Sequence, residues 1–124
     1  MPKYGSIEGH NCSVVENWVA TYSDPIQVAN GETIELDGRV DVWDGHTWLW
    51  AKNLEGKEGW IPDCIVSNEA PFKATETYSA MELTCRKGQS LKALRVLHGW
   101  AWCSDENGKN GWVPERNLHM INRS

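Results

Sequence analysis

The chain repeats one pattern twice, and this repeat restricts its possible folds more than any other feature. Each half holds two tryptophans separated by one residue, in "TWLW" at 47–50 and "GWAW" at 99–102. Each then continues through a polar stretch containing glycine into "GWIP" at 59–62 or "GWVP" at 111–114, with the same spacing. Shared order and spacing indicate a duplicated structural unit. We therefore expect two copies of one small domain.

The local patterns predict strands joined by tight turns. Apolar residues alternate with polar ones in "ETIEL" and "SLKAL", the period of a half-buried strand. "NLEGKEG" and "SDENGKNG" lie between alternating runs and are typical of hairpin loops, with Gly56 and Gly108 supplying a positive φ. Many short strands in so short a repeat predict an all-β fold, a small barrel or sandwich.

The stretch "SNEAPF" at 67–72 is the predicted junction between the copies, because it is polar and contains a proline. The first domain is predicted at 1–68, with a barrel at about 18–67, and the second at 69–124, with a barrel at about 72–120. Residues before about 16 match nothing in the second half. They are expected to be irregular or to cover a sheet edge.

The first half carries an insertion between its glycine and its first paired tryptophan. Gly31 and Trp48 are 17 positions apart, whereas Gly88 and Trp100 are 12 apart. The extra residues lie within "DGRVDVWDGH", which is interpreted as a loop.

The alternation of side chains predicts which way the tryptophans point. Residues two apart in a strand share a face, so each tryptophan pair lies opposite small or medium residues. A narrow barrel interior has room for the smaller set, and we therefore expect the tryptophans to face outward as a contact surface. The alternative is that the indoles are buried where the two barrels meet. The residues expected in the core are Leu49, Ala51, Ala101 and Cys103.

Charge and cysteine usage narrow the functional classes. The formal net charge of −5 disfavours nucleic-acid binding, which normally requires a basic surface. Neither a leader peptide nor an apolar run of membrane-spanning length is recognisable, so we expect a cytoplasmic protein without membrane contact. The four cysteines form no C-x-x-C pair and are expected to be reduced, with Cys85 and Cys103 buried.

Each half resembles a Src-homology-3 (SH3) domain. "ATETYSAMELTCRKGQSLKAL" is similar to the first strand, acidic loop and diverging turn of that family, and "HGWAWCSDENGKNGWVPERNL" to its tryptophan strand, distal hairpin and closing G-x-x-P segment. The first half matches more loosely, through "VATYSD", "VANGETIEL" and "TWLWAKNLEGKEGWIPDCIV". The resemblance implies two tandem SH3-like barrels of five short strands each with a short linker, and the short loops resemble those of prokaryotic members.

The resemblance also implies a function and a set of contact residues. Typical members bind proteins or peptides, often proline-rich ones, whose extended helix loses little entropy on docking. Asp24 or Glu82 would be the acidic residue that meets a basic ligand side chain. Carried over position by position, the ligand-binding residues are Tyr22, Trp48, Trp60 and Pro62 in the first half and Tyr78, Trp100, Trp112 and Pro114 in the second.

The sequence offers little for catalysis, and we expect no enzyme, no cofactor and no metal. Its histidines are scattered, and the only grouping with metal-ligand chemistry is Asp41, Asp44 and His46 in the inserted stretch. The leading hypothesis is a non-catalytic protein- or peptide-binding module. The alternatives are a structural tandem-barrel protein with vestigial grooves and a cell-wall-targeting module. Nothing in the sequence indicates the oligomeric state.

Overall fold

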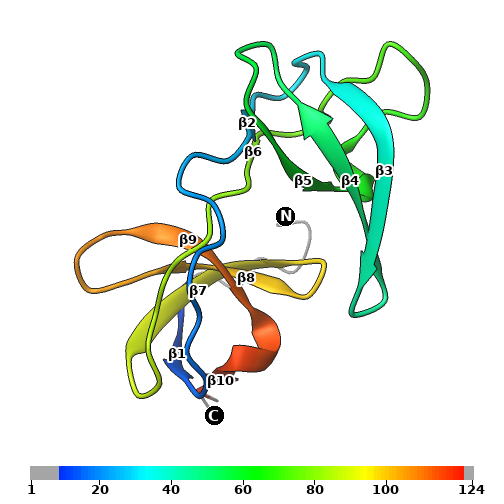
Figure 1. The fold of residues 1–124 in the computed structure, drawn as a ribbon. Coiled ribbons are helices and arrows are strands. Elements are labelled where there is room, and N and C mark those ends of the chain that lie inside the picture. The colour runs from blue at the N-terminus through cyan, green and yellow to red at the C-terminus, as the bar shows by residue number, and fades with distance from the viewer. Residues whose placement is uncertain (1–8, 122–124) are drawn as a thin grey trace. The chain divides into compact units, whose positions relative to one another are not determined.

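The computed structural model describes residues 9–121 of the chain, and in this part the regular structure is almost entirely β (Figure 1). The all-β prediction is thus confirmed. The strands and the two short 3-10 helices are, in chain order, β1 (His10–Val14), β2 (Gln27–Val28), β3 (Glu35–Trp43), β4 (His46–Lys52), β5 (Glu58–Pro62), η1 (Asp63–Ile65), β6 (Tyr78–Ser79), β7 (Ser90–Leu97), β8 (Trp100–Ser104), β9 (Asn110–Pro114), η2 (Glu115–Asn117) and β10 (Leu118–Met120).

The chain forms two compact units, and one is inserted into the other. Unit 1 comprises residues 1–21 and 82–124, of which 9–21 and 82–121 are described, and unit 2 comprises residues 22–81. The N-terminal segment therefore belongs to the unit that holds the second copy of the repeat.

Unit 1 contains a five-stranded antiparallel sheet in the order β10-β1-β7-β8-β9. Strand β1 lies inside this sheet, since Cys12 is opposite Met120 on one side and Leu91 on the other. The lead sequence is predicted to be irregular or to cover a sheet edge. Residues 10–14 cover the outer side of β7 as a regular strand, and β10 pairs with the other side of this strand. The rest of the lead, up to residue 8, lies outside the described residues.

Residues 9–21, which we call the N-terminal arm, supply part of the core of unit 1. Cys12 and Val14 are almost completely buried, and their burial removes apolar surface from water. The core cluster consists of Cys12, Val14, Leu83, Cys85, Leu91, Ala93, Ala101, Cys103, Val113 and Leu118.

Unit 2 has a three-stranded sheet, β3-β4-β5, and a two-stranded ladder, β2-β6. The ladder joins Val28 of the first repeat to Tyr78 of the second. Two isolated bridges, Thr33 to Lys73 and Val66 to Ala74, also pair residues of the first repeat with the opening segment of the second. Each unit is therefore completed by a segment from the other repeat. Strand pairing thus crosses the domain boundary predicted at 68 and 69, and that boundary stays a prediction about the sequence repeat.

The inserted stretch of the first repeat is a strand extension and a turn. Its residues lengthen β3, and Asp44 and Gly45, with φ of 51° and 79°, form a two-residue turn into β4. The prediction of a loop here is wrong, because alternating valines in "RVDVW" extend the ladder opposite β4. The equivalent turn of unit 1 consists of His98 and Gly99, both also at positive φ.

The two distal hairpins are built alike. The Asn53 side-chain oxygen accepts hydrogen bonds from the Glu55 and Lys57 amides at 3.0 and 2.9 Å. Asp105 does the same for the two corresponding amides in unit 1. Gly56 and Gly108 have φ of 87° and 81°, which confirms the predicted positive values.

The described strands do not close into barrels. They form three separate sheets, so the predicted SH3-like architecture is confirmed at the level of strand content and tandem organisation, but ring closure is wrong. In unit 2 the closing contacts are isolated bridges, and Pro71 beside them has no N–H to extend a ladder. Among residues 9–121, no helix is long and apolar enough to span a bilayer.

Three cysteines lie in the interior of unit 1, and all four are unbridged thiols. The prediction that Cys85 and Cys103 are buried is confirmed, and the reduced state of the thiols stays a prediction. Burial raises the pKa of Cys85. A side-chain hydrogen bond with Cys12, together with burial, raises the pKa of Cys103, which keeps this thiol protonated.

Candidate protein-interaction surface

The small residues of the tryptophan strands face the interior, as the alternation predicts. Ala51, Ala101 and Cys103 are fully buried, whereas Leu49 is only partly so. The tryptophans occupy the other face of each strand, but they are less exposed than predicted. Trp48 has only 8% of its surface exposed, and Trp50, Trp100 and Trp102 are half-buried.

For Trp50 and Trp102 the reason is that each indole packs against another indole. Trp50 meets Trp60 edge to face, with ring centroids 5.1 Å apart, and Trp102 meets Trp112 in the same way at 5.2 Å. Both pairs are directly opposite each other in their ladders, so the strand register brings the rings together. The prediction of an open row of indoles is therefore wrong for these rings, which form packed pairs.

In unit 2 this packing leaves three accessible rings with one arginine beside them. We call this group the unit 2 aromatic surface, and its members are Tyr22, Trp50, Trp60 and Arg39. The Tyr22 ring, 42% exposed, is 6.3 Å from that of Trp50. On the Trp50 ring the Arg39 guanidinium carbon lies 4.6 Å from the centroid, within the range of a cation–π contact.

Charged residues fix the edge of this surface. The Trp50 indole N–H donates to a Glu58 carboxylate oxygen at 2.8 Å, and the Arg39 Nε donates to Asp37 at 2.8 Å. The hydrogen bond between Asp37 and Arg39 lowers the pKa of Asp37, and the same hydrogen bond raises the pKa of Arg39. Arg39 thus stays charged and is held over the indole from one side. The surface offers flat apolar rings beside one cation and two carboxylates.

The aromatics of unit 1 are tied to its N-terminal arm. Trp18 packs edge to face on Trp100, with centroids 5.4 Å apart and an interplanar angle of 81°. The Trp18 indole N–H donates to Glu82 at 3.1 Å, and the Thr21 amide donates to the same oxygen at 3.0 Å. These contacts use the rings to attach the arm to the rest of the unit.

The two acidic residues expected to meet a basic ligand group already have partners within their own units. Glu82 accepts the hydrogen bonds just described. Asp24 lies 3.0 Å from the Lys57 ammonium, and its hydrogen bond raises the pKa of that lysine.

The predicted ligand-binding residues divide by exposure. Tyr22 is exposed, and Trp60 and Trp100 are half-buried. The remaining five, which are buried, are Trp48, Pro62, Tyr78, Trp112 and Pro114. The structure brings Tyr22 and Trp60 together around Trp50. As ligand contacts, all eight remain a prediction.

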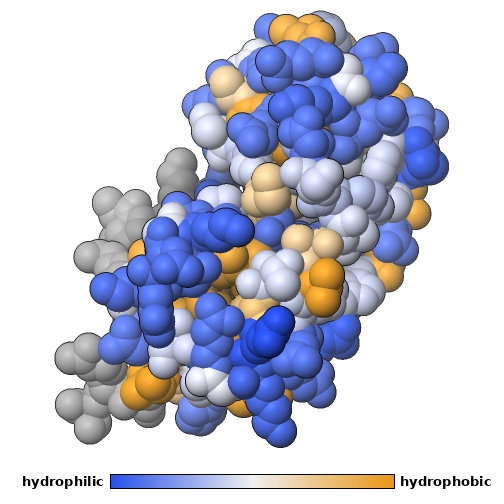
Figure 2. Space-filling model, turned by 60° about the vertical axis from the view of Figure 1, so that its left-hand side comes forward, coloured by the Kyte–Doolittle hydropathy of each residue, from blue (hydrophilic) through white to orange (hydrophobic). Residues whose placement is uncertain are grey.

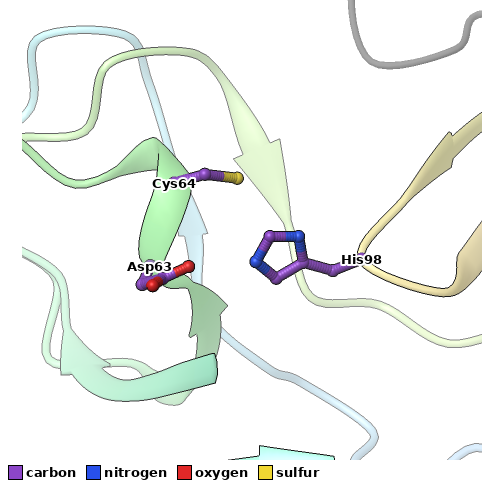
Figure 3. Close-up of side chains that lie close together, drawn as sticks. All are labelled: Asp63, Cys64 and His98. Carbon is purple, nitrogen blue, oxygen red and sulfur yellow. The ribbon is translucent and has the colours of Figure 1, made fainter. Parts of the chain in front are cut away.

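Side chains with metal-ligand chemistry occur in the inserted stretch, in η1 and in the turn before β8. Among the described residues, Asp41, Asp44 and His46 are not gathered closely enough to share an ion. Figure 3 shows Asp63 and Cys64 projecting from η1 of unit 2, and His98 projecting from the turn before β8 of unit 1.

Sequence reasoning missed three residues that organise these surfaces: Trp50, Arg39 and Trp18. Trp50 was grouped with Trp48, yet it is the one that contacts Tyr22 and Arg39. Arg39 could have been found only by recognising the insertion as a strand. On the face drawn in Figure 2, hydrophobic residues form separate groups between hydrophilic ones.

Comparison with known proteins identifies both repeats. The family model described as a variant SH3 domain matches residues 12–69 and again residues 71–121. No curated protein matches the chain. The first match begins with β1, which pairs within unit 1, and most of unit 1 comes from the second match. The second match begins with the segment that contains β6, which pairs within unit 2.

Proposed function

Because the chain belongs to the variant SH3 domain family, whose members are generally protein-interaction modules, we propose that it is a non-catalytic module that binds a protein or peptide through the unit 2 aromatic surface. The family match covers nearly the whole chain, in two copies. The proposal places the ligand on unit 2 and gives unit 1 a supporting role.

The observation that carries this proposal is the contact of Tyr22, Trp60 and Arg39 with Trp50. Rings held by their neighbours lose little side-chain entropy when a ligand covers them, so this part of the cost of binding is small. The guanidinium and the Glu58 carboxylate beside them can orient a polar ligand backbone. An extended peptide with apolar or proline residues fits such a surface.

The test is titration of the ¹⁵N-labelled chain with a library of proline-rich and other extended peptides, followed by NMR. We expect shifts of the Trp50 and Trp60 indole signals. Tyr22→Ala removes an exposed ring and should weaken binding about tenfold or more. Trp102→Ala, in the corresponding strand of unit 1, is the matched control and should leave binding unchanged.

A different result would redirect the proposal. If peptides shift only unit 1 signals, or if Tyr22→Ala and Trp102→Ala weaken binding equally, the unit 2 aromatic surface is not the contact site. Retention of the unchanged chain on purified peptidoglycan would instead support cell-wall targeting.

A second candidate is a structural role for the aromatic positions. It is favoured by the burial of Trp48, Tyr78 and Trp112, three of the residues expected to bind ligand. Buried aromatics stabilise a fold by the apolar area that they remove from water. Unchanged indole signals throughout the peptide library would favour this role.

A further inference from the structure

Strand β3 forms the outer edge of the unit 2 sheet, which has the order β3-β4-β5 (Figure 1). Its counterpart in unit 1 is β7, which pairs with β8 in the corresponding hairpin. The first part of β7 is covered on its outer side by β1, from Ser90 to Ala93. The corresponding strand is therefore an edge strand in unit 2 and an internal strand in unit 1.

The covering segment of unit 2 is cut short. The Ile34 amide donates to the Phe72 carbonyl at 3.0 Å, and Thr33 bridges Lys73. The next residue outward along this segment is Pro71, which has no N–H to donate. From Glu35 onward, no strand among residues 9–121 pairs with the outer side of β3.

The turn geometry shows which backbone groups point outward. Trp43 and His46 flank the two-residue turn, and such a closing pair exchanges both hydrogen bonds. From Trp43 back to Val40 the pairing alternates, so Val42 and Val40 direct their N–H and C=O groups away from β4. The register against β4 shifts between Val40 and Leu36, where Gly38 has a φ of 91°. Their side chains are 65% and 57% exposed, respectively. Exposed apolar residues on an open edge are a template for strand addition.

The sequence of this edge is complementary to itself. An antiparallel pairing of two β3 strands centred on Val40 places the two Val40 residues opposite each other. It also places Arg39 of each strand opposite Asp41 of the other, twice by symmetry. Arg39 already pairs with Asp37 of its own chain, so Asp41 of the second copy would be a further carboxylate partner. Opposite charges in directly facing positions stabilise a strand pair, and like charges destabilise it.

We propose that β3 is a homodimerisation edge, on which a second copy of this chain adds its own β3 antiparallel in the register centred on Val40. Charge complementarity favours a second copy over an unrelated strand, because "RVD" at 39–41 supplies both members of each ion pair. The contact is a short strand edge, smaller than the interfaces of stable dimers, so the dissociation constant should be micromolar or weaker. The proposal shares Arg39 with the proposed peptide-binding surface but uses none of its aromatic rings.

The first experiment measures self-association of the full chain by sedimentation equilibrium over a wide concentration range. We expect a monomer–dimer equilibrium. Val40→Lys and Val42→Lys place a cation on the edge and should each raise the dissociation constant about tenfold or more. Leu54→Lys makes the same change at a residue that is 76% exposed in the distal hairpin of the same unit, and should have no effect.

The second experiment tests the register by exchanging charges. Asp41→Arg puts Arg opposite Arg39 in a homodimer, and Arg39→Asp puts Asp opposite Asp41, so each variant alone should be more monomeric. Mixed together, the two variants restore both opposite-charge pairs, and the heterodimer should be the main dimer. Asp41→Arg leaves the unit 2 aromatic surface unchanged, so peptide titration of this variant separates the two proposals.

Three results would overturn the proposal: a chain that stays monomeric at millimolar concentration, a dimer unaffected by Val40→Lys and Val42→Lys, or a dimer weakened equally by Leu54→Lys. A mixture that forms no heterodimer would overturn the register. Slowed exchange of the Val40 amide hydrogen with rising concentration would support the edge contact directly.

Discussion

The two units derive from the same repeat but use their opening segments differently. In unit 1 the opening segment, residues 10–21, forms strand β1 over residues 10–14 and contributes Cys12 and Val14 to the core. In unit 2 the corresponding segment makes two bridges and the short strand β6. The comparison teaches that one fold tolerates an opening segment that pairs with the sheet over several residues or over only a few. Where the pairing is short, as in unit 2, a strand edge stays open.

The largest effect is expected from separating the segments. A fragment of residues 22–81 contains all of unit 2 and should fold cooperatively. A fragment of residues 69–124 lacks β1, with its two core side chains and its ladder to β10, and should be unfolded. Circular dichroism with thermal melting measures both.

Adding a peptide of residues 9–21 to the fragment 69–124 is the control. It should restore a folded signal, because the missing strand is supplied in trans. Cooperative folding of 69–124 alone would show that this half can use its own opening segment, and the contrast between the units would then disappear.

The next effect concerns two equivalent glycines in β5 and β9. A Cβ on Gly111 would lie 2.6 Å from the backbone carbon of Glu82, whereas a Cβ on Gly59 would meet the Ile26 methyl at 2.9 Å. Backbone cannot give way as a side chain can. Gly111→Ala should therefore lower the free energy of unfolding by about 3 kcal/mol and Gly59→Ala by about 1 kcal/mol.

Urea denaturation of the full chain measures both changes. Equal stability of the two variants would contradict the prediction. It would mean that the backbone of Glu82 approaches Gly111 less closely than the structure shows, and that the two glycines are equally crowded.

A smaller effect is expected at the residue before β10. Asn117 is buried, and its amide donates to the Glu16 and Asn17 carbonyls, which attaches the arm of unit 1. Its equivalent in unit 2 is Ile65, which is fully buried in an apolar site. Asn117→Ala should lower the free energy of unfolding by about 1–2 kcal/mol, because two carbonyls lose their donor.

Amide hydrogen exchange locates this loss. Protection should fall along residues 10–21 and remain unchanged at β3 to β5. A uniform fall across both units would contradict a role confined to the arm.

The smallest effect concerns pH and the unit 2 aromatic surface. Arg39 lowers the pKa of Asp37 below its ordinary value of 3.8, so the interaction stabilises the folded chain above that pH and is lost as pH falls through the lowered pKa. The Trp50 indole signal should therefore shift at the acid end of a titration. Asp37→Asn should remove this step, and persistence of the same step in the variant would assign it to another group.

Much of the fold could be predicted from the sequence because the repeat and its alternation are local signals. Ala51 and Cys103 were placed in the core by strand period alone. The exchange of opening segments could not be predicted, because residues 10–14 match nothing in the second half and only tertiary contacts place them in the unit 1 sheet. The site was predicted less well: Tyr22 and Trp60 are accessible, but Pro62 and Pro114 are buried, since family position does not determine exposure.

The insertion of unit 2 within unit 1 has a consequence for the order in which the chain can mature on the ribosome. Strand β1 is synthesised before unit 2, but its partners β7 and β10 are synthesised after it. Unit 2, encoded without interruption, is complete well before then. Strand β1 must therefore remain without its partner strands until β7 and β10 have been synthesised.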